Sequence, residues 1–257
     1  MIKIKPAFVL IFSLFLFAAC EEEVSCGDSD SLSCFLQTHA ERSQSKNLRA
    51  CAAGGQEGFL DDPALPVSVF FYPIPGATEF RYFETDDLSA NPDDFSAFKE
   101  ITLDGLPVFN GYLHRFTRSA STEDTWSRVV YFTPDSVHIS NAIRLKDATK
   151  PSEFAPELLN IDLSNPLEPI FSWTDGRTPE NEIYFHVVSD ENGTLISGTY
   201  TFDKNFQFYN LDNVVLNIRD VDPAPTLTSG ETYNFTLMGV SLDNWVNLIV
   251  DTTFVAE

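Results

Sequence analysis

Residues 227–237 read Leu-Thr-Ser-Gly-Glu-Thr-Tyr-Asn-Phe-Thr-Leu, and they are the strongest indication of fold in the 257-residue chain. The sequence before them has the pattern of short β-strands, in which apolar residues alternate with polar ones because one face of a strand is buried. The alternating runs are Phe171 and Trp173; Ile183, Phe185 and Val187; and Val214, Leu216 and Ile218. A turn at Asp190-Glu191-Asn192-Gly193 and strand-like segments at 194–202 and 206–209 continue this pattern.

The order leucine, glycine, tyrosine within 227–237 resembles the E–F corner of fibronectin type III domains. In such β-sandwiches the tyrosine opens strand F, and its hydroxyl bonds back to upstream backbone. Trp173 lies where that family often has a core tryptophan on strand B. The resemblance covers roughly residues 167–257 and implies an architecture without an activity.

Strand-like runs also fill the sequence before residue 150. Val67, Val69 and Phe71 fall on one strand, and the segments 78–85, 97–103, 111–118, 127–133 and 137–145 follow. A weak repeat links the two regions, because Tyr112 precedes Trp126 by 14 residues and Tyr233 precedes Trp245 by 12. Each tryptophan also has an aspartate two positions before it.

These patterns predict an all-β fold of two tandem immunoglobulin/fibronectin type III-like β-sandwiches. The first is expected at residues 65–149 and the second at 167–257, joined by a linker over 150–166 that contains Pro151 and Pro156.

The first residues predict where the protein is located. Lys3 and Lys5, the apolar run 7–17 and two alanines have the layout of a secretory signal peptide over residues 1–19. The sequence Phe17-Ala18-Ala19-Cys20 resembles the lipobox of bacterial lipoproteins, which implies lipidation of Cys20 and an outer-membrane anchor. Glu21 to Glu23 resemble a surface-export signal, so surface exposure is favoured over a periplasm-facing position.

Residues 20–64 are interpreted as the lipidated cysteine and a tether, with one short helix within 31–47. After Cys20 the chain has three further cysteines, Cys26, Cys34 and Cys51. Export to an oxidising compartment favours one disulfide, most plausibly Cys34–Cys51, and leaves one thiol over. Their spacing does not match a zinc site.

Composition excludes some classes of function. The formal charge of −22 would repel nucleic acid, so no nucleic-acid partner is expected. A hydrophobic content of 43% with 23 phenylalanines is enough to build cores.

No sequence motif points to catalysis, so no catalytic residue, metal or cofactor is predicted. The histidines His114, His138 and His186 fall on different expected strands. The acidic loop with Asp86, Asp87, Asp93 and Asp94 lacks EF-hand spacing and is interpreted as solvated. Short Asp-Ser/Thr-aliphatic-type motifs resemble a bacterial O-glycosylation signal, with acceptors at Ser31, Ser136 and Thr252.

The predicted function is therefore non-enzymatic: a membrane-anchored lipoprotein whose ectodomain binds or scaffolds an envelope partner. The alternative is a surface polysaccharide-binding lipoprotein of a glycan-uptake system, because aromatic side chains can stack on sugar rings. The candidate ligand-facing aromatics are Tyr200, Phe202, Phe206, Phe208 and Tyr209. The partners expected are the membrane, through the lipid anchor, and an envelope protein or a glycan.

Overall fold

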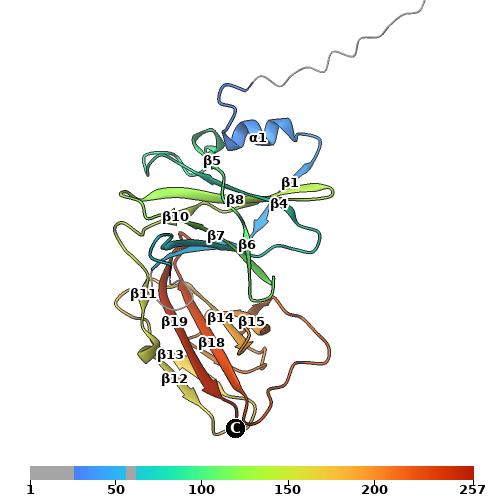
Figure 1. The fold of residues 1–257 in the computed structure, drawn as a ribbon, viewed down its shortest axis with the longest axis vertical. Coiled ribbons are helices and arrows are strands. Elements are labelled where there is room, and N and C mark those ends of the chain that lie inside the picture. The colour runs from blue at the N-terminus through green and yellow to red at the C-terminus, as the bar shows by residue number, and fades with distance from the viewer. Residues whose placement is uncertain (1–25, 56–61) are drawn as a thin grey trace, which may run out of the picture.

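The computed structural model describes residues 26–55 and 62–257, in which one short α-helix accompanies four β-sheets (Figure 1). The predicted signal peptide, Cys20 and the acidic residues after it lie outside the described residues. The four sheets pair into two sandwiches, so the predicted all-β class is confirmed.

Sheets 1 and 2 form the first sandwich. Sheet 1 has the order β1-β9-β8-β4-β5, with β10 also paired to β8. Its strands are β1 (Ser43–Leu48), β4 (Thr78–Glu84), β5 (Lys99–Ile101), β8 (Thr125–Thr133), β9 (Ser136–Ser140) and β10 (Ile143–Leu145). Sheet 2 has the order β2-β3-β7-β6, with β2 (Ala50–Gly54), β3 (Val67–Phe71), β6 (Leu106–Val108) and β7 (Leu113–Arg118).

Sheets 3 and 4 form the second sandwich. Sheet 3 has the order β11-β19-β18-β14-β15-β17. Its strands are β11 (Glu153–Phe154), β14 (Ile183–Asp190), β15 (Leu195–Thr201), β17 (Val214–Asn217), β18 (Thr232–Val240) and β19 (Val246–Val255). Sheet 4 has the order β12-β13-β16, with β12 (Leu159–Asp162), β13 (Ile170–Trp173) and β16 (Asn205–Gln207). Short 3₁₀ helices, η2 (Phe95–Ala97) and η3 (Pro156–Leu158), lie between strands.

The two sandwiches share one connectivity. In the immunoglobulin-type order, β2-β3-β7-β6 are strands A-B-E-D and β5-β4-β8-β9 are strands C′-C-F-G. In the second sandwich β12-β13-β16 are A-B-E and β15-β14-β18-β19 are C′-C-F-G. In each case an extra strand, β1 or β11, runs parallel to strand G. The strand order therefore confirms two tandem sandwiches of immunoglobulin/fibronectin type III type.

The predicted corner is present in the second sandwich. The backbone N–H of Thr228 donates to the hydroxyl of Tyr233 at 2.9 Å, which is the bond back to upstream backbone that the resemblance implies. Gly230 has φ +83°, a left-handed conformation that glycine adopts without a steric penalty. Leu227 and Trp173 are both buried in the core between sheets 3 and 4.

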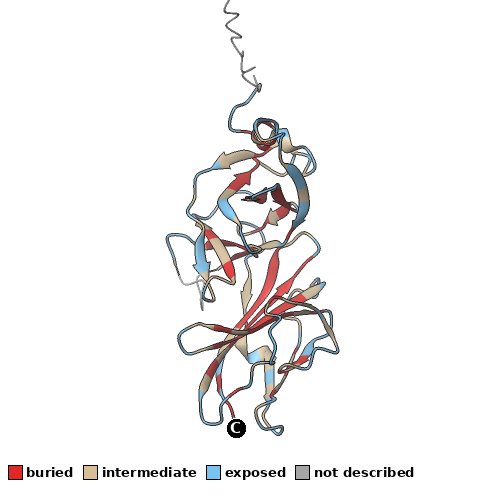
Figure 2. Cartoon of the chain, turned by 90° about the vertical axis from the view of Figure 1, so that its right-hand side faces the viewer, coloured by how far each residue is buried: buried red, intermediate tan, exposed pale blue. Residues whose placement is uncertain are grey.

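The inner sheets, 2 and 3, are buried on both faces. On β3, Val69 and Phe71 pack toward sheet 1, and Phe70 packs toward sheet 3. On β14, Tyr184 packs toward sheet 4, and Phe185 packs toward sheet 2. The sheets therefore stack in the order 1-2-3-4 with three cores between them, and buried segments continue through the junction of the sandwiches (Figure 2).

Helix α1 (Leu32–Thr38) covers the outer face of sheet 1. Ser31 caps the helix by accepting the N–H of Cys34 at 3.2 Å, which satisfies one of the unpaired donors of the first turn. Leu32 and Leu36 pack with Phe83 and other apolar residues of sheet 1.

The hairpin between β18 and β19 joins the second sandwich to the first. Its Trp245 is fully buried in the core between sheets 1 and 2, and its indole N–H donates to the Lys150 carbonyl at 2.9 Å. Gly54 leaves room for this ring, because a Cβ there would lie 2.9 Å from Cη2 of Trp245. The N–H of Ala52 donates to the Asn244 carbonyl at 3.0 Å. Side-chain packing and backbone hydrogen bonds thus both connect the two sandwiches.

The predicted tether over 20–64 is wrong where the structure describes it, because most of this segment is folded. The predicted short helix within 31–47 is present as α1, but after it β1 and β2 join sheets 1 and 2. β1 pairs through its backbone while its side chains are mostly exposed, so its sequence has no apolar alternation. The predicted linker is also partly wrong, since β11 and β12 lie within it and pair in sheets 3 and 4.

Two further predictions are corrected. The disulfide joins Cys26 to Cys34, with Cα atoms 5.4 Å apart, and Cys51 is a free thiol. α1 places Cys34 beside Cys26, whereas Cys51 lies on β2 in a different layer. The weak repeat does not align equivalent strands, because Trp126 lies on strand F of its sandwich and Trp245 begins strand G of the other.

Replacing Trp245 with alanine is expected to destabilise the whole chain by about 3–5 kcal/mol, because it leaves a large cavity in the first sandwich. Urea unfolding, followed by far-UV circular dichroism and tryptophan fluorescence, measures this loss. Leu242→Ala in the same hairpin is the matched control, since Leu242 is 82% exposed. Wild-type protein should unfold in one transition by both probes; two separate transitions would contradict the shared core.

The buried His186 should make stability depend on pH. Burial lowers the pKa of His186 to about 3, and its Nδ1 lies 2.8 Å from the Thr199 hydroxyl. The unfolded chain, with a pKa of about 6.5, binds a proton that the folded chain excludes. Stability is therefore full above pH 6.5 and falls by up to about 1.4 kcal/mol per unit as pH decreases toward 3. Urea unfolding at pH 7 and at pH 5 measures this effect. Over that range the free energy of unfolding of wild-type protein should fall by about 2 kcal/mol more than that of His186→Phe. If the free energies of unfolding of wild type and His186→Phe changed equally with pH, His186 would not be the cause of the pH dependence.

Candidate functional site

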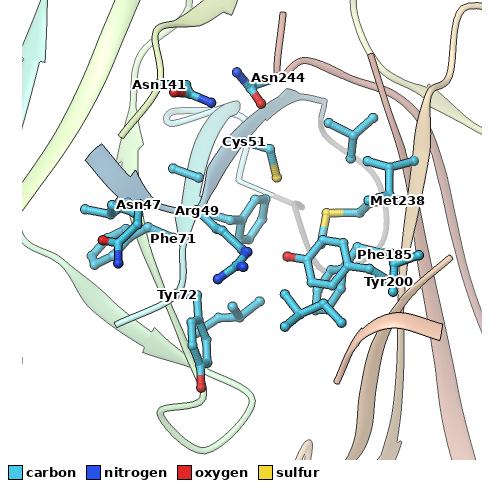
Figure 3. Close-up of a pocket in the computed structure, with 18 of the residues that line it drawn as sticks. Asn47, Arg49, Cys51, Phe71, Tyr72, Asn141, Phe185, Tyr200, Met238 and Asn244 are labelled. Carbon is cyan, nitrogen blue, oxygen red and sulfur yellow. The ribbon is translucent and has the colours of Figure 1, made fainter. Parts of the chain in front are cut away.

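A pocket of about 440 Å³ opens between sheets 2 and 3, beside the turn from β1 to β2 (Figure 3). Its size is within the range of about 300–1,000 Å³ that is typical of small-molecule sites. The pocket lies where the two sandwiches meet, so its walls come from strands far apart in the sequence. Its lining residues are Lys46 to Cys51, Phe70 to Tyr72, Leu113, Asn141, Ile183, Phe185, Tyr200, Val215, Leu216, Met238, Val240 and Asn244.

The walls are apolar because they continue the core between sheets 2 and 3. Phe185 and Tyr200, on neighbouring strands, stack with ring centroids 4.5 Å apart. Phe70 is contributed by β3, and Met238 lies on β18 with its sulfur toward the open space (Figure 3). An apolar ligand group would therefore find a preformed surface here.

The mouth of the pocket is polar and contains hydrogen-bond donors without acceptors. The Arg49 guanidinium extends into the space between Tyr72 and Tyr200 (Figure 3). Within the described part of the chain, neither this guanidinium nor the Tyr200 hydroxyl has a hydrogen-bond or ion-pair partner. The charged lining residues are Lys46 and Arg49, and none of the described lining residues is a carboxylate. The Lys46 ammonium lies over the Phe95 ring on the outer side of sheet 1, 5.3 Å from its centroid, so Arg49 supplies the positive charge at the mouth. The pocket is thus locally basic in a chain whose formal charge is −22.

Apart from Arg49, the side chains that face the pocket are uncharged. Burial raises the pKa of Tyr200 well above its ordinary value, so its hydroxyl stays protonated and can donate. Burial also raises the pKa of the Cys51 thiol to about 12, so the thiol is neutral at physiological pH and a poor nucleophile. The site can therefore bind a ligand, but it contains no activated nucleophile among the described residues.

The predicted aromatic ladder does not form one surface. Phe206, on β16, and Phe208, just after it, are buried in the core between sheets 3 and 4, because β16 pairs with β13 in sheet 4. Tyr200 lines the pocket on the other face of sheet 3. Phe202 is 64% exposed beyond the end of β15, and the Tyr209 hydroxyl donates to the Arg219 carbonyl at 3.1 Å. Of the five, the structure places Tyr200 in the pocket.

The other predicted groups also remain apart. His114, His138 and His186 lie in sheets 2, 1 and 3, and no group of residues suited to a metal ion occurs in the described chain. In the acidic loop, Asp86 pairs with Lys99 at 3.0 Å, and Asp94 caps η2.

The glycosylation motifs differ in accessibility. Ser31 is buried and caps α1, so a glycan there would displace the helix cap, which disfavours this acceptor. Ser136 and Thr252 are partly exposed and stay predictions.

Sequence analysis did not identify Arg49, Tyr72 or Met238 as site residues. Arg49 lies in the segment interpreted as a tether, and the pocket exists because β2 and β3 pack against sheet 3. One signal was available: Arg49 is followed by Ala50-Cys51-Ala52-Ala53, an apolar run of small residues that suits a closely packed strand.

No helix within the described residues has the length and apolar character to cross a membrane.

Comparison with known proteins identifies no family. No family model matches the sequence, and no curated protein matches it. Solved structures with some likeness include titin domains A168–A170, with TM-score 0.28 and 6% identity over 84% of this chain. The chain spans 61% of that titin fragment. Chicken CNTN1 FN1–FN3 domains give TM-score 0.31 and 10% identity, covering 84% of this chain and 68% of that one.

A third solved structure is the Spr0440 glycoside hydrolase domain, Endo-D, from Streptococcus pneumoniae R6. It gives TM-score 0.30 and 12% identity, covering 82% of this chain and 36% of that one. These low scores carry no functional inference.

Cysteine mapping tests the chemistry of the pocket. Alkylation of native protein at pH 7.5 should modify Cys51 at least about a hundredfold more slowly than alkylation of unfolded protein, because burial suppresses its thiolate. Mass spectrometry without reduction should recover a Cys26–Cys34 linked peptide, which serves as the internal control. Rapid native alkylation of Cys51, or its recovery in a disulfide, would contradict the structure.

Proposed function

We propose that this protein is a membrane-anchored lipoprotein whose ectodomain acts by binding rather than by catalysis. The observation that carries the proposal is the pocket between sheets 2 and 3, with apolar walls and unpaired donors at its mouth. A pocket of this kind, held between two packed sheets, suits the capture of a ligand in a fixed geometry.

The lipid anchor is proposed from the lipobox-like sequence that ends at Cys20. The described chain begins near α1, and the C-terminus lies at the opposite end of the molecule (Figure 1). Five residues separate Cys20 from Cys26, so the two lie at most about 20 Å apart along the chain. An anchored protein would therefore hold α1 next to the membrane and the second sandwich far from it, with the pocket between them.

The polysaccharide alternative loses its main support, because the five aromatics proposed for sugar stacking divide between a core, a pocket and the surface. Surface exposure remains the favoured orientation, on the acidic residues that follow Cys20.

Cell fractionation tests the anchor. Wild-type protein should sediment with membranes, and Cys20→Ala should move most of it to the soluble fraction, because the thiol that carries the lipid is lost. Cys51→Ala is the matched control and should stay membrane-bound. Protease added to intact cells should digest the ectodomain if it faces outward. Membrane association of the Cys20→Ala protein would contradict the lipid anchor. Protection of the ectodomain from protease until the cells are lysed would contradict the outward orientation.

A further inference from the structure

We propose that the pocket between sheets 2 and 3 binds a small amphiphile with one anionic head group, held at Arg49 and Tyr200 with its apolar part between the sheets. This inference rests on the proposed binding function and names the chemical class of the ligand.

The head-group argument rests on charge and on hydrogen-bond donors that have no acceptor within the described part of the chain. Arg49 is exposed at the mouth and lacks a carboxylate partner among the described residues, although acidic residues outnumber basic ones 38 to 16 in the chain. A guanidinium pairs best with a planar anion, to which it can donate two parallel hydrogen bonds. The Tyr200 hydroxyl adds a third donor that has no acceptor within the described chain.

The apolar argument rests on the walls. The space is lined by buried apolar side chains, namely Phe70, Phe185, Met238 and Val240. A hydrocarbon chain that enters the space would be transferred out of water, and the packing of the core would not need to change. Each methylene that becomes buried strengthens binding by up to about fourfold. Met238 also adapts to ligand shape, because its side chain is unbranched and flexible.

Other classes of ligand fit less well. A cationic amphiphile would meet Arg49 at the mouth, with no anion from the described lining residues to offset its charge. A neutral sugar would leave the buried walls without an apolar partner. A volume of about 440 Å³ suits a small molecule better than a folded protein.

Nuclear magnetic resonance offers a direct test, because Met238 is the one methionine in the sequence after Met1. The chain from residue 21, which contains all the described residues, would carry a ¹³C-methyl label on methionine. Decanoate, decanol, decyltrimethylammonium and hexanoate would be titrated separately. We expect decanoate to shift the Met238 methyl signal and to bind at least about tenfold more tightly than decanol, because its head group pairs with Arg49. Hexanoate should bind more weakly than decanoate, and decyltrimethylammonium should bind weakest.

Arg49→Gln should weaken decanoate binding about tenfold and leave decanol binding unchanged. Arg177→Gln is the matched control, since Arg177 is an exposed arginine that pairs with Glu153 outside the pocket. Tyr200→Phe is a second variant that removes only the hydroxyl, and it should reduce the preference for decanoate over decanol. Thermal unfolding verifies that each variant is folded; Arg49 is exposed, so its replacement should not affect the fold.

Several results would overturn the inference: no shift of Met238 with decanoate, equal affinity for the three decyl head groups, or equal effects of Arg49→Gln and Arg177→Gln. Failure here is distinguishable from failure of the anchored-lipoprotein proposal, because fractionation of the Cys20→Ala protein does not depend on the pocket.

Discussion

The burial of both faces of sheets 2 and 3 is the constraint on which the rest of the structure depends. In an isolated β-sandwich the outer face of each sheet is solvated and polar, but here β3 and β14 are buried along almost their whole length. Their outward side chains, such as Phe70 and Phe185, form a third core between the sandwiches. This core fixes the relative position of the two sandwiches, which inter-domain contacts in multidomain chains often leave free to vary.

The pocket follows from incomplete closure of this third core. Sheets 2 and 3 diverge beside the β1–β2 turn, so apolar side chains that would otherwise be covered line an open space. The turn places Arg49 at the mouth of that space, with no acidic neighbour among the described lining residues. Apolar walls with an exposed arginine at their mouth, in an acidic protein, select ligands by both hydrophobicity and charge.

Much of the fold could be predicted from the sequence, because the strands of the second sandwich alternate clearly and the corner around Tyr233 has a specific pattern. β1 and β2 could not be predicted in this way. The residues of β1 are polar because the strand pairs at a sheet edge, and those of β2 are small because Trp245 packs against Gly54. The site could not be predicted: Arg49 lies between β1 and β2, Tyr72 follows β3 and Met238 lies on β18, and only the packing of sheet 2 on sheet 3 brings them together. Of the expected ligand-facing aromatics, Tyr200 lies in the pocket, while Phe206 lies on the opposite side of sheet 3.

Trp245 makes the second sandwich less portable than most immunoglobulin-like modules. Such modules spread among proteins by recombination because each one folds wherever it is inserted. Here the hairpin that carries Trp245 completes the core of the neighbouring sandwich, and Gly54 on that neighbour is shaped to accept it. Exchange of either sandwich alone would therefore leave the other with an incomplete core.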